Sequence, residues 1–186
     1  MGRGLYEIGL GLHVLGGAGV ETTEPEDVPR DVPPEGVPAS AQAAVVDRVV
    51  DGDTLRVTVH ESGGAIEPTD SVRVRLLNID APELDHPDRG EDCGAVEATE
   101  VVERLTPPGA VVWLVADVED RDRYDRPLRA VFTGDGTWVN AEVVRQGWAE
   151  VMLVEPNDRF HDALLPVEAE AREARRGAWA TCGGFP

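Results

Sequence analysis

Eight residues of this sequence have side chains suited to chemistry on a phosphate, and they cluster in three short stretches where strands are expected to end. They are Asp51, Asp53, Arg75, Asp80, Glu83, Arg123, Tyr124 and Arg126. Carboxylate and carbonyl oxygens are the ligands that hard divalent cations prefer. Arginine binds phosphate oxygens through two parallel hydrogen bonds. Hydrolysis of a phosphodiester also needs a base for the attacking water and positive charge where negative charge accumulates. The residue types therefore predict metal-assisted phosphodiester hydrolysis.

The predicted cation ligands are Asp53, Asp80 and the backbone carbonyl oxygen of Ala81. The alternative is structural, because an Asp-Gly-Asp sequence is common in hairpin turns and Asp80-Ala81-Pro82 alone is an ordinary turn.

The predicted base is Glu83, and the predicted phosphate clamp consists of Arg75 and Arg126. Taken singly, each is a weak indication, because an arginine in a strand is often solvated and the 119–126 segment can be a charged exposed turn. Their joint order and spacing are what indicate a site.

The apolar pattern predicts the elements that must position these residues. Two apolar runs within residues 43–59 flank Asp51 and Asp53, and further strands are predicted at 71–79, 110–117 and 128–133. Helices are predicted at 95–105, at 139–147 with Asn140 as N-cap, and at 158–177, where Pro166 should kink or split the helix. Five strands with a helix after the third predict an α+β fold, the five-stranded Greek-key barrel called the OB-fold, with about three helices.

The composition is strongly acidic, with 36 Asp and Glu against 17 basic residues, all of them arginine, and a net charge of −19. Such a surface suits concentrated salt, where repulsion is screened within roughly 3 Å at 1 M, although an acidic protein from a GC-rich genome is the alternative. Net acidity argues against a polyanionic partner. The objection weakens at high salt, or where a few arginines converge on one site.

The chain is expected to divide into three parts. Residues 1–20 form a weak signal-like or anchor segment, or follow a mis-assigned start codon, and they are too interrupted by charge for a good membrane span. Residues 21–40 are rich in Pro and Glu and are expected to be a disordered tether. The folded domain is expected over 41–186. An exported or cell-surface protein is the expectation, with a cytoplasmic one as the alternative.

The two cysteines, Cys93 and Cys182, lie in no zinc-binding pattern. They form either one disulfide that closes a long loop, which would indicate an oxidising compartment, or two unrelated thiols.

Five stretches, taken in order, resemble successive blocks of the staphylococcal nuclease (thermonuclease) family: VVDGDTLRV, VRLLNIDAPE, DRYDRPLRAVF, VNAEVVRQGWAEV and EAEAREARRGAW. The resemblance covers roughly residues 44–179. It implies an OB-fold, a catalytic calcium ion, and hydrolysis of DNA and/or RNA that leaves 3′-phosphate ends. It implies no stable protein partner, and we expect a monomer.

By motif position the resemblance assigns a role to each residue. Calcium ligands are Asp53, Asp80 and the Ala81 carbonyl, with Asp51 behind them; catalytic positions are Arg75, Glu83 and Arg126; substrate contacts are Tyr124 and Arg123. In the resembled fold the end of the chain packs back on the barrel, which favours a bridge between the two cysteines.

Three positions depart from the family pattern. Ala81 replaces a threonine, which leaves a carbonyl ligand in place, and Asp125 replaces a glycine and adds negative charge near the phosphate site. Leu153 stands where the family has a nucleotide-stacking tyrosine, so weaker base stacking is expected there.

Two other functions remain open from the sequence. A catalytically silent nucleic-acid-binding OB module would typically have lost the arginines or carboxylates, and a tethered adhesion domain would need neither a phosphate clamp nor a metal site.

Overall fold

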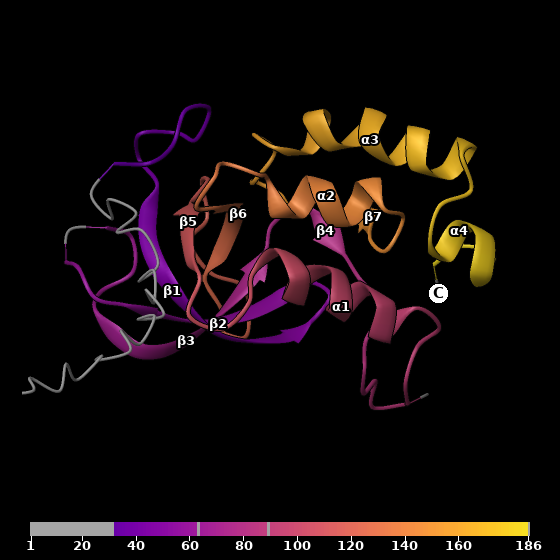
Figure 1. Ribbon diagram of the computed structural model, residues 1–186, viewed down its shortest axis with the longest axis horizontal. Coiled ribbons are helices and arrows are strands. Elements are labelled where there is room, and N and C mark those ends of the chain that lie inside the picture. Colours follow the sequence, from indigo (N-terminus) through magenta and orange to yellow (C-terminus); the bar gives the residue numbers. More distant parts are fainter. Residues whose placement is uncertain (1–31, 63, 89, 186) are drawn as a thin grey trace, which may run out of the picture.

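Five strands close into a barrel in the order β1-β2-β3-β6-β5 in the computed structural model, which describes residues 32–62, 64–88 and 90–185 (Figure 1). The barrel strands are β1 (Gln42–Asp51), β2 (Thr54–Val59), β3 (Thr69–Leu76), β5 (Val111–Val115) and β6 (Leu128–Thr133). A separate two-stranded sheet joins β4 (Ile79–Asp80) to β7 (Glu150–Val151). The α+β class and the five-stranded barrel predicted from the sequence are therefore confirmed.

Four helices lie in the described part of the chain: α1 (Ala95–Leu105), α2 (Val139–Arg145), α3 (His161–Glu173) and α4 (Ala178–Thr181). Figure 1 shows α1, α2 and α3 stacked beside the barrel, with α4 beyond the stack near the end of the chain. The prediction of about three helices omitted only the single turn α4.

The barrel closes because β1 bends. Its first residues pair with β5 and its later residues with β2, both antiparallel. Two register shifts interrupt the β1–β2 ladder, between Val46 and Arg48 and between Val49 and Asp51. Bulges of this kind bend a strand and increase its twist, which closure requires. The second shift lies directly before the Asp51-Gly52-Asp53 turn.

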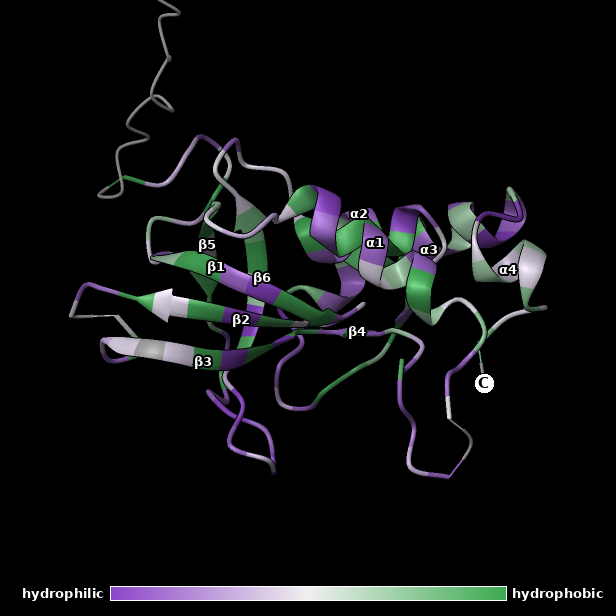
Figure 2. Cartoon of the chain, turned by 60° about the horizontal axis from the view of Figure 1, so that its bottom comes forward, coloured by the Kyte–Doolittle hydropathy of each residue, from purple (hydrophilic) through white to green (hydrophobic). Residues whose placement is uncertain are grey.

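Both faces of β5 and β6 are buried. Val112 and Leu114 belong to the main core, which contains side chains from all five barrel strands and from α1, α2 and α3. The alternate residues Trp113 and Val115 belong to a second cluster on the outer face, which Phe160 covers. Figure 2 shows hydrophobic and hydrophilic residues along α1, α2 and α3, whose buried hydrophobic residues contribute to the main core. Burial on both faces explains the nearly continuous apolar sequence of β5.

The strand expected at 71–79 is broken in two. β3 ends at Leu76, and Asn78 has a positive φ of 61° before β4 begins at Ile79. The Asn78 side chain donates a hydrogen bond to the carbonyl oxygen of Asn157, 2.8 Å away, and asparagine adopts this backbone region more readily than apolar residues do. The turn redirects the chain from the barrel into the β4–β7 sheet, and with it Asp80.

The helix expected at 95–105 is present with those bounds. The assignment of Asn140 as an N-cap was wrong, because Trp138 holds that position in α2. Asn140 is instead buried inside the helix, where its amide accepts from the backbone N–H of Val131 and donates to the carbonyl oxygen of Leu77. It therefore ties α2 to β6 and to the turn after β3.

The last long helix begins later than predicted, at His161, and remains one helix with Pro166 inside it. Asp158 opens the preceding turn through its carbonyl oxygen, which accepts from the backbone N–H of His161.

The segment 32–40 packs against the barrel through Val37, although the sequence predicted a disordered tether up to residue 40. Val37 is buried in the outer cluster, where it packs with Leu77 and Trp113. An apolar residue among the prolines thus extends the folded part beyond the expected start at residue 41. The segment predicted at 1–20 and the rest of the tether lie outside the described residues. In the described ranges no helix has the length and apolarity needed to cross a membrane.

Candidate active site

The Asp51-Gly52-Asp53 turn is pressed against α1 and the β4 exit. A Cβ atom added to Gly52 would lie 2.6 Å from the Cβ of Ala98 and 2.8 Å from that of Ala81. Only glycine fits this approach, because real Cβ contacts do not reach such distances. The Asp51 carboxylate accepts a hydrogen bond from the backbone N–H of Asp53 at 3.1 Å. The turn therefore has a defined shape and a fixed position on the helix.

Arg75 is the centre of the site. Its guanidinium is buried, with a residue exposure of 8%. Nη2 lies 3.1 Å from the Asp53 carboxylate and 2.7 Å from that of Asp80, so a carboxylate from the β1–β2 turn and one from β4 approach the same nitrogen. Nη1 donates to the carbonyl oxygens of Leu76 and Ile79 at 2.6 and 2.7 Å. Arg75 thus fastens the turn that follows its own strand as well as the two acidic residues.

The carboxylates of the site are crowded. Burial, followed by the negative charge of Asp53, raises the pKa of Asp51 to about 7. Burial also raises the pKa of Asp80, and the neighbouring charges of Asp53 and Glu83 add to this effect while Arg75 opposes it. A bound cation would favour the ionised forms of these groups.

Glu83 is held through its backbone by a residue that the sequence did not single out. The buried Asp92 accepts a hydrogen bond from the Glu83 backbone N–H at 3.1 Å, and the Asp92 N–H donates to the Glu83 carbonyl oxygen at 2.9 Å. This reciprocal pair fixes the backbone of Glu83, a residue that lines the pocket described next.

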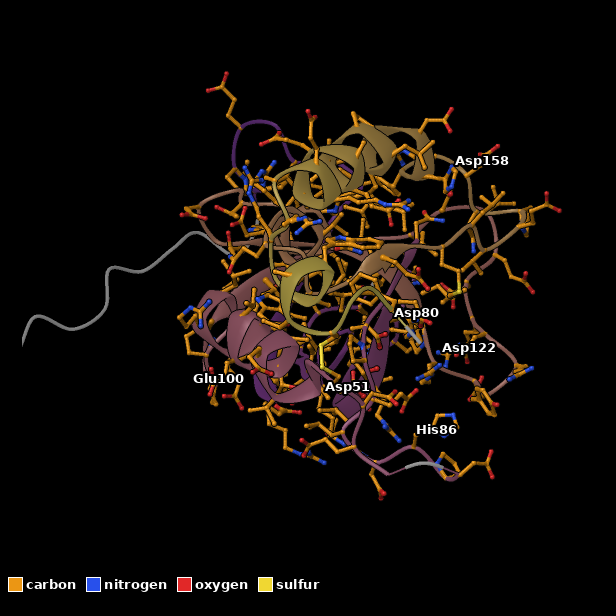
Figure 3. All side chains as sticks on the ribbon, turned by 90° about the vertical axis from the view of Figure 1, so that its right-hand side faces the viewer. Asp51, Asp80, His86, Glu100, Asp122 and Asp158 are labelled. Atoms are coloured by element: carbon orange, nitrogen blue, oxygen red, sulfur yellow. A yellow bond between two sulfur atoms is a disulfide. The ribbon has the colours of Figure 1, made fainter. Side chains whose placement is uncertain are left out.

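A polar pocket lies at the exit of β4, lined by Asp80, Ala81, Pro82, Glu83, His86, Asp92, Glu150 and Phe185. Figure 3 shows Asp80 and His86 on the side of the molecule that this view presents. Glu150 reaches it because β7 pairs with β4, which sets Glu150 opposite Asp80. Burial, then the charges of Asp80 and Glu168, raises the pKa of Glu150. The sequence reasoning missed His86, Glu150 and Phe185, and only the β4–β7 pairing and the fold of the last residues bring the latter two here.

Arg126 and Tyr124 form a neighbouring cluster on the loop before β6. The Arg126 Nε donates to the Asp122 carboxylate at 2.7 Å, and that carboxylate also accepts from the backbone N–H groups of Arg126 and Tyr124. The exposed Tyr124 ring has the guanidinium carbons of Arg126 and Arg123 at 5.5 and 4.7 Å from its centroid. The loop thus presents two arginines and a phenol to solvent.

The barrel brings this loop beside Arg75. β3 and β6 are parallel neighbours, and the Arg75 backbone N–H donates to the carbonyl oxygen of Pro127 at 2.9 Å. The structure therefore joins the predicted residues as two adjacent clusters, one around Arg75 and one around Arg126.

Arg129 supports the loop and was not identified from the sequence. It is 1% exposed, and its Nη2 lies 2.6 Å from the Asp120 carboxylate, while Nη1 donates to the carbonyl oxygens of Leu128 and Asp120. Burial lowers its pKa, although Asp120 opposes the shift. The local alternation of apolar and polar residues cannot distinguish a buried arginine in a strand from a solvent-exposed one, and for this reason the sequence did not single out Arg129.

The oxygen ligands at the Arg75 cluster suit a hard cation. Asp53 and Asp80 share one guanidinium nitrogen, and the backbone N–H of Ala81 donates to Asp53, so the predicted ligand residues adjoin one another. In the ranges that the structure describes, no three acidic, histidine or cysteine side chains have the spacing of a complete metal cage. Two carboxylates, a carbonyl and several waters match the oxygen coordination of calcium, and they lack the nitrogen and sulfur ligands of structural zinc.

Cys93 and Cys182 are joined by a disulfide, with Cα atoms 5.8 Å apart and a sequence separation of 89 residues. This is the pair that the resemblance favoured. The bond connects the loop before α1, directly after Asp92, to the residue that follows α4. Figure 3 shows it as a yellow bond.

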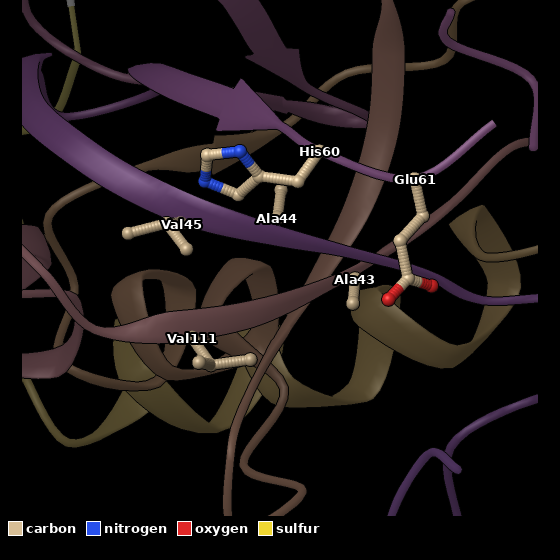
Figure 4. A pocket seen from close by; sticks show the side chains of 6 residues that line it. All are labelled: Ala43, Ala44, Val45, His60, Glu61 and Val111. Carbon is tan, nitrogen blue, oxygen red and sulfur yellow. The ribbon is translucent and has the colours of Figure 1, made fainter. Parts of the chain in front are cut away.

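A second hollow lies elsewhere on the barrel, between β1 and β5. Figure 4 shows the short side chains of Ala43, Ala44, Val45 and Val111 with His60 and Glu61 beside them. It contains none of the eight residues predicted to act on a phosphate.

Comparisons with known proteins identify the family of the chain. The family model for staphylococcal nuclease homologues matches residues 73–181. An uncharacterised endonuclease of Escherichia coli O157:H7 is 35% identical over 141 residues, which cover 75% of this chain and 78% of that protein. The thermonuclease of Staphylococcus intermedius is 29% identical over 139 residues, or 74% of this chain and 76% of that protein. Endonuclease YhcR of Bacillus subtilis (strain 168) is 30% identical over 152 residues, and this chain spans only 12% of its length. The chain therefore belongs to the family of staphylococcal nuclease homologues.

Proposed function

We propose that this protein is a calcium-dependent nuclease that hydrolyses phosphodiester bonds of DNA and/or RNA and leaves 3′-phosphate ends. The observation that carries the proposal is the bridging of Asp53 and Asp80 by Arg75 beside a pocket that contains Glu83. Relatives named endonuclease and thermonuclease support it.

Asp53, Asp80 and the Ala81 carbonyl would hold the calcium ion, with Asp51 supporting the Asp53 turn through its hydrogen bond. When bound, such a cation supplies positive charge that stabilises negative charge on a phosphate. Arg75 keeps the two carboxylates together, and the reciprocal bonds with Asp92 hold the Glu83 backbone.

Glu83 would accept the proton of the attacking water. Glu83 lines the pocket next to Asp80, so it is available to a water that would enter there. Arg126, with Tyr124 and Arg123 beside it, would bind the phosphate from the adjacent loop, and its guanidinium would oppose the charge that develops there.

The test is incubation of the full chain with plasmid DNA and with single-stranded RNA, in calcium and in EDTA. We expect cleavage in calcium only, and products that a polymerase extends only after a phosphatase has removed the 3′-phosphate. Binding without cleavage in calcium would identify the silent nucleic-acid-binding module instead. If the chain neither binds nor cleaves nucleic acid, both functions are excluded. If a polymerase extends the products without phosphatase treatment, the proposed 3′-phosphate product is contradicted.

A further inference from the structure

Phe185 belongs to the same pocket as Glu83 and Asp80, although it lies about a hundred positions later in the chain. Of the described residues that line the pocket, it alone contributes a phenyl ring. The same residue also lines a different hollow, next to the disulfide, together with Cys93, Cys182, Gly183 and Gly184. Phe185 therefore separates the disulfide from the candidate active site.

The segment 182–185, called here the anchored segment, is held at three points. The disulfide fixes Cys182 to the loop before α1. Gly183 and Gly184 have φ angles of 80° and 120°, in the region that favours glycine, and the Gly184 N–H donates to the carbonyl oxygen of Ala178 at 3.1 Å. The Phe185 ring then packs edge-on against Trp179, with ring centroids 4.9 Å apart. Two consecutive glycines thus reverse the chain and set the ring at the pocket wall.

The chemistry of the Phe185 side chain limits which part of a nucleic acid can face this wall. A phenyl ring offers a phosphate group neither charge nor a hydrogen-bond donor. The arginines that suit a phosphate group gather on the neighbouring loop. An uncharged base has a flat face that stacks on aromatic rings, a contact worth about 1–3 kcal/mol per base, or roughly a 5- to 150-fold change in affinity.

We propose that Phe185 contacts a base of the substrate next to the cleaved phosphate, and that the Cys93–Cys182 disulfide keeps the ring in that position. The inference rests on the proposed nuclease function and adds a substrate-contacting residue to it.

The first experiment compares steady-state kinetics of the full chain and of Phe185→Ala on a single-stranded oligonucleotide with one cleavable linkage. We expect Phe185→Ala to raise KM roughly 5- to 150-fold with little change in kcat, and Phe185→Trp to restore KM. Leu165→Ala, which truncates an exposed side chain of α3, is the control and should match the unmodified chain. An unchanged KM in Phe185→Ala would overturn the proposal.

A second substrate separates base contact from a merely structural role. The same oligonucleotide is made with abasic residues on both sides of the cleavable linkage. If Phe185 contacts a base, the unmodified chain and Phe185→Ala should have the same KM on this substrate. An equal loss on both substrates would show that the variant damages the site in general, and would overturn the proposal.

The disulfide is tested with Cys93→Ser/Cys182→Ser, with and without Phe185→Ala. We expect the double-serine variant to raise KM as Phe185→Ala does, and the triple variant to raise it no further. Because Cys93 follows Asp92, which holds Glu83, kcat is expected to fall as well, so the comparison uses KM alone. Additive effects on KM would refute the role of the disulfide. If this variant does not fold, Phe185→Ala and Phe185→Trp still decide the role of the ring.

An inactive unmodified chain would refute the nuclease function itself. An active chain whose KM is the same with Phe185→Ala would refute only this inference.

Discussion

Arg75 shows how one side chain can serve two purposes at the scale of single residues. Four of its contacts are within the protein, two to carbonyl oxygens of its own turn and two to acidic side chains. Its sequence position predicted a phosphate clamp, and in the structure its guanidinium joins the carboxylates of Asp53 and Asp80, which we propose as calcium ligands. A guanidinium contributes five N–H donors in a planar fork, so lysine cannot reproduce this set of contacts.

Glu83→Gln is the residue-scale prediction for catalysis. Gln keeps the size of the side chain and the backbone bonds to Asp92, but it cannot accept the proton of the water. We expect kcat to fall on the order of 100- to 1,000-fold, and Arg126→Ala to cause a loss of similar size.

The matched control for that measurement is Glu103→Gln on the exposed face of α1, which should be fully active. Melting temperatures and circular dichroism establish that the variants are folded. Activity of folded Glu83→Gln equal to that of the control would remove Glu83 from the mechanism.

The loop between β5 and β6 is the element that depends most on ionised side chains. Partial burial alone would raise the pKa of Asp122, but hydrogen bonds from the Arg126 N–H and guanidinium and from the Tyr124 N–H outweigh it and lower that pKa. A group whose pKa is lower in the folded state stabilises the fold above its unfolded pKa of about 3.9. This contribution is lost as the pH falls through the folded-state pKa.

Asp122→Asn is therefore expected to lower the melting temperature at pH 6–7, with a difference from the unmodified chain that shrinks below about pH 4. Asp135→Asn is the matched control. Hydrogen bonds also lower the pKa of Asp135, with Thr133 as the largest cause, but its turn lies after β6, away from Arg126. Both variants should lose stability, and only Asp122→Asn should also lose activity. A constant melting difference across this pH range would contradict the ionic role of Asp122.

Local patterns predicted the elements well where glycine or proline marks the ends of an element. Gly94 precedes α1 and Pro107 follows it, and that helix has its predicted bounds. The predictions failed where distant residues decide the conformation. The break at Asn78 depends on its hydrogen bond to Asn157. Asn140 is not an N-cap, because its side chain instead bonds to β6 and to the turn after β3. The chemistry-bearing turns were identified from residue types, whereas Asp92, Arg129 and Phe185 act through contacts that local sequence does not contain.

At the scale of the whole molecule, the proposed calcium binding would be linked to folding. The crowding that raises the pKa values of Asp51 and Asp80 opposes folding when no cation is bound. Calcium at 100 times its Kd would stabilise the folded state by about 2.7 kcal/mol, which corresponds to a rise in melting temperature of roughly 5–10 °C for a chain of this size.

Thermal unfolding with and without calcium, at constant ionic strength, measures this shift. Constant ionic strength matters because screening alone stabilises a chain with a net charge of −19. Asp53→Ala should abolish most of the shift. A shift of equal size in that variant would place the bound calcium elsewhere.

The contact between Gly52 and α1 has a consequence for how this protein tolerates mutation. Gly52 has no functional group, yet every side chain placed there would collide with the Cβ atoms of Ala98 and Ala81. Gly52→Ala should destabilise the fold by about 1–3 kcal/mol and displace the aspartates on either side. Gly134→Ala, where an added Cβ would meet its nearest neighbour at an ordinary 3.6 Å, is the matched control and should be tolerated. In a library with all twenty residues at each position, selection for activity should return glycine at position 52 as strictly as it returns the charged residues around it, so that the most constrained residue of the loop is the one without a side chain.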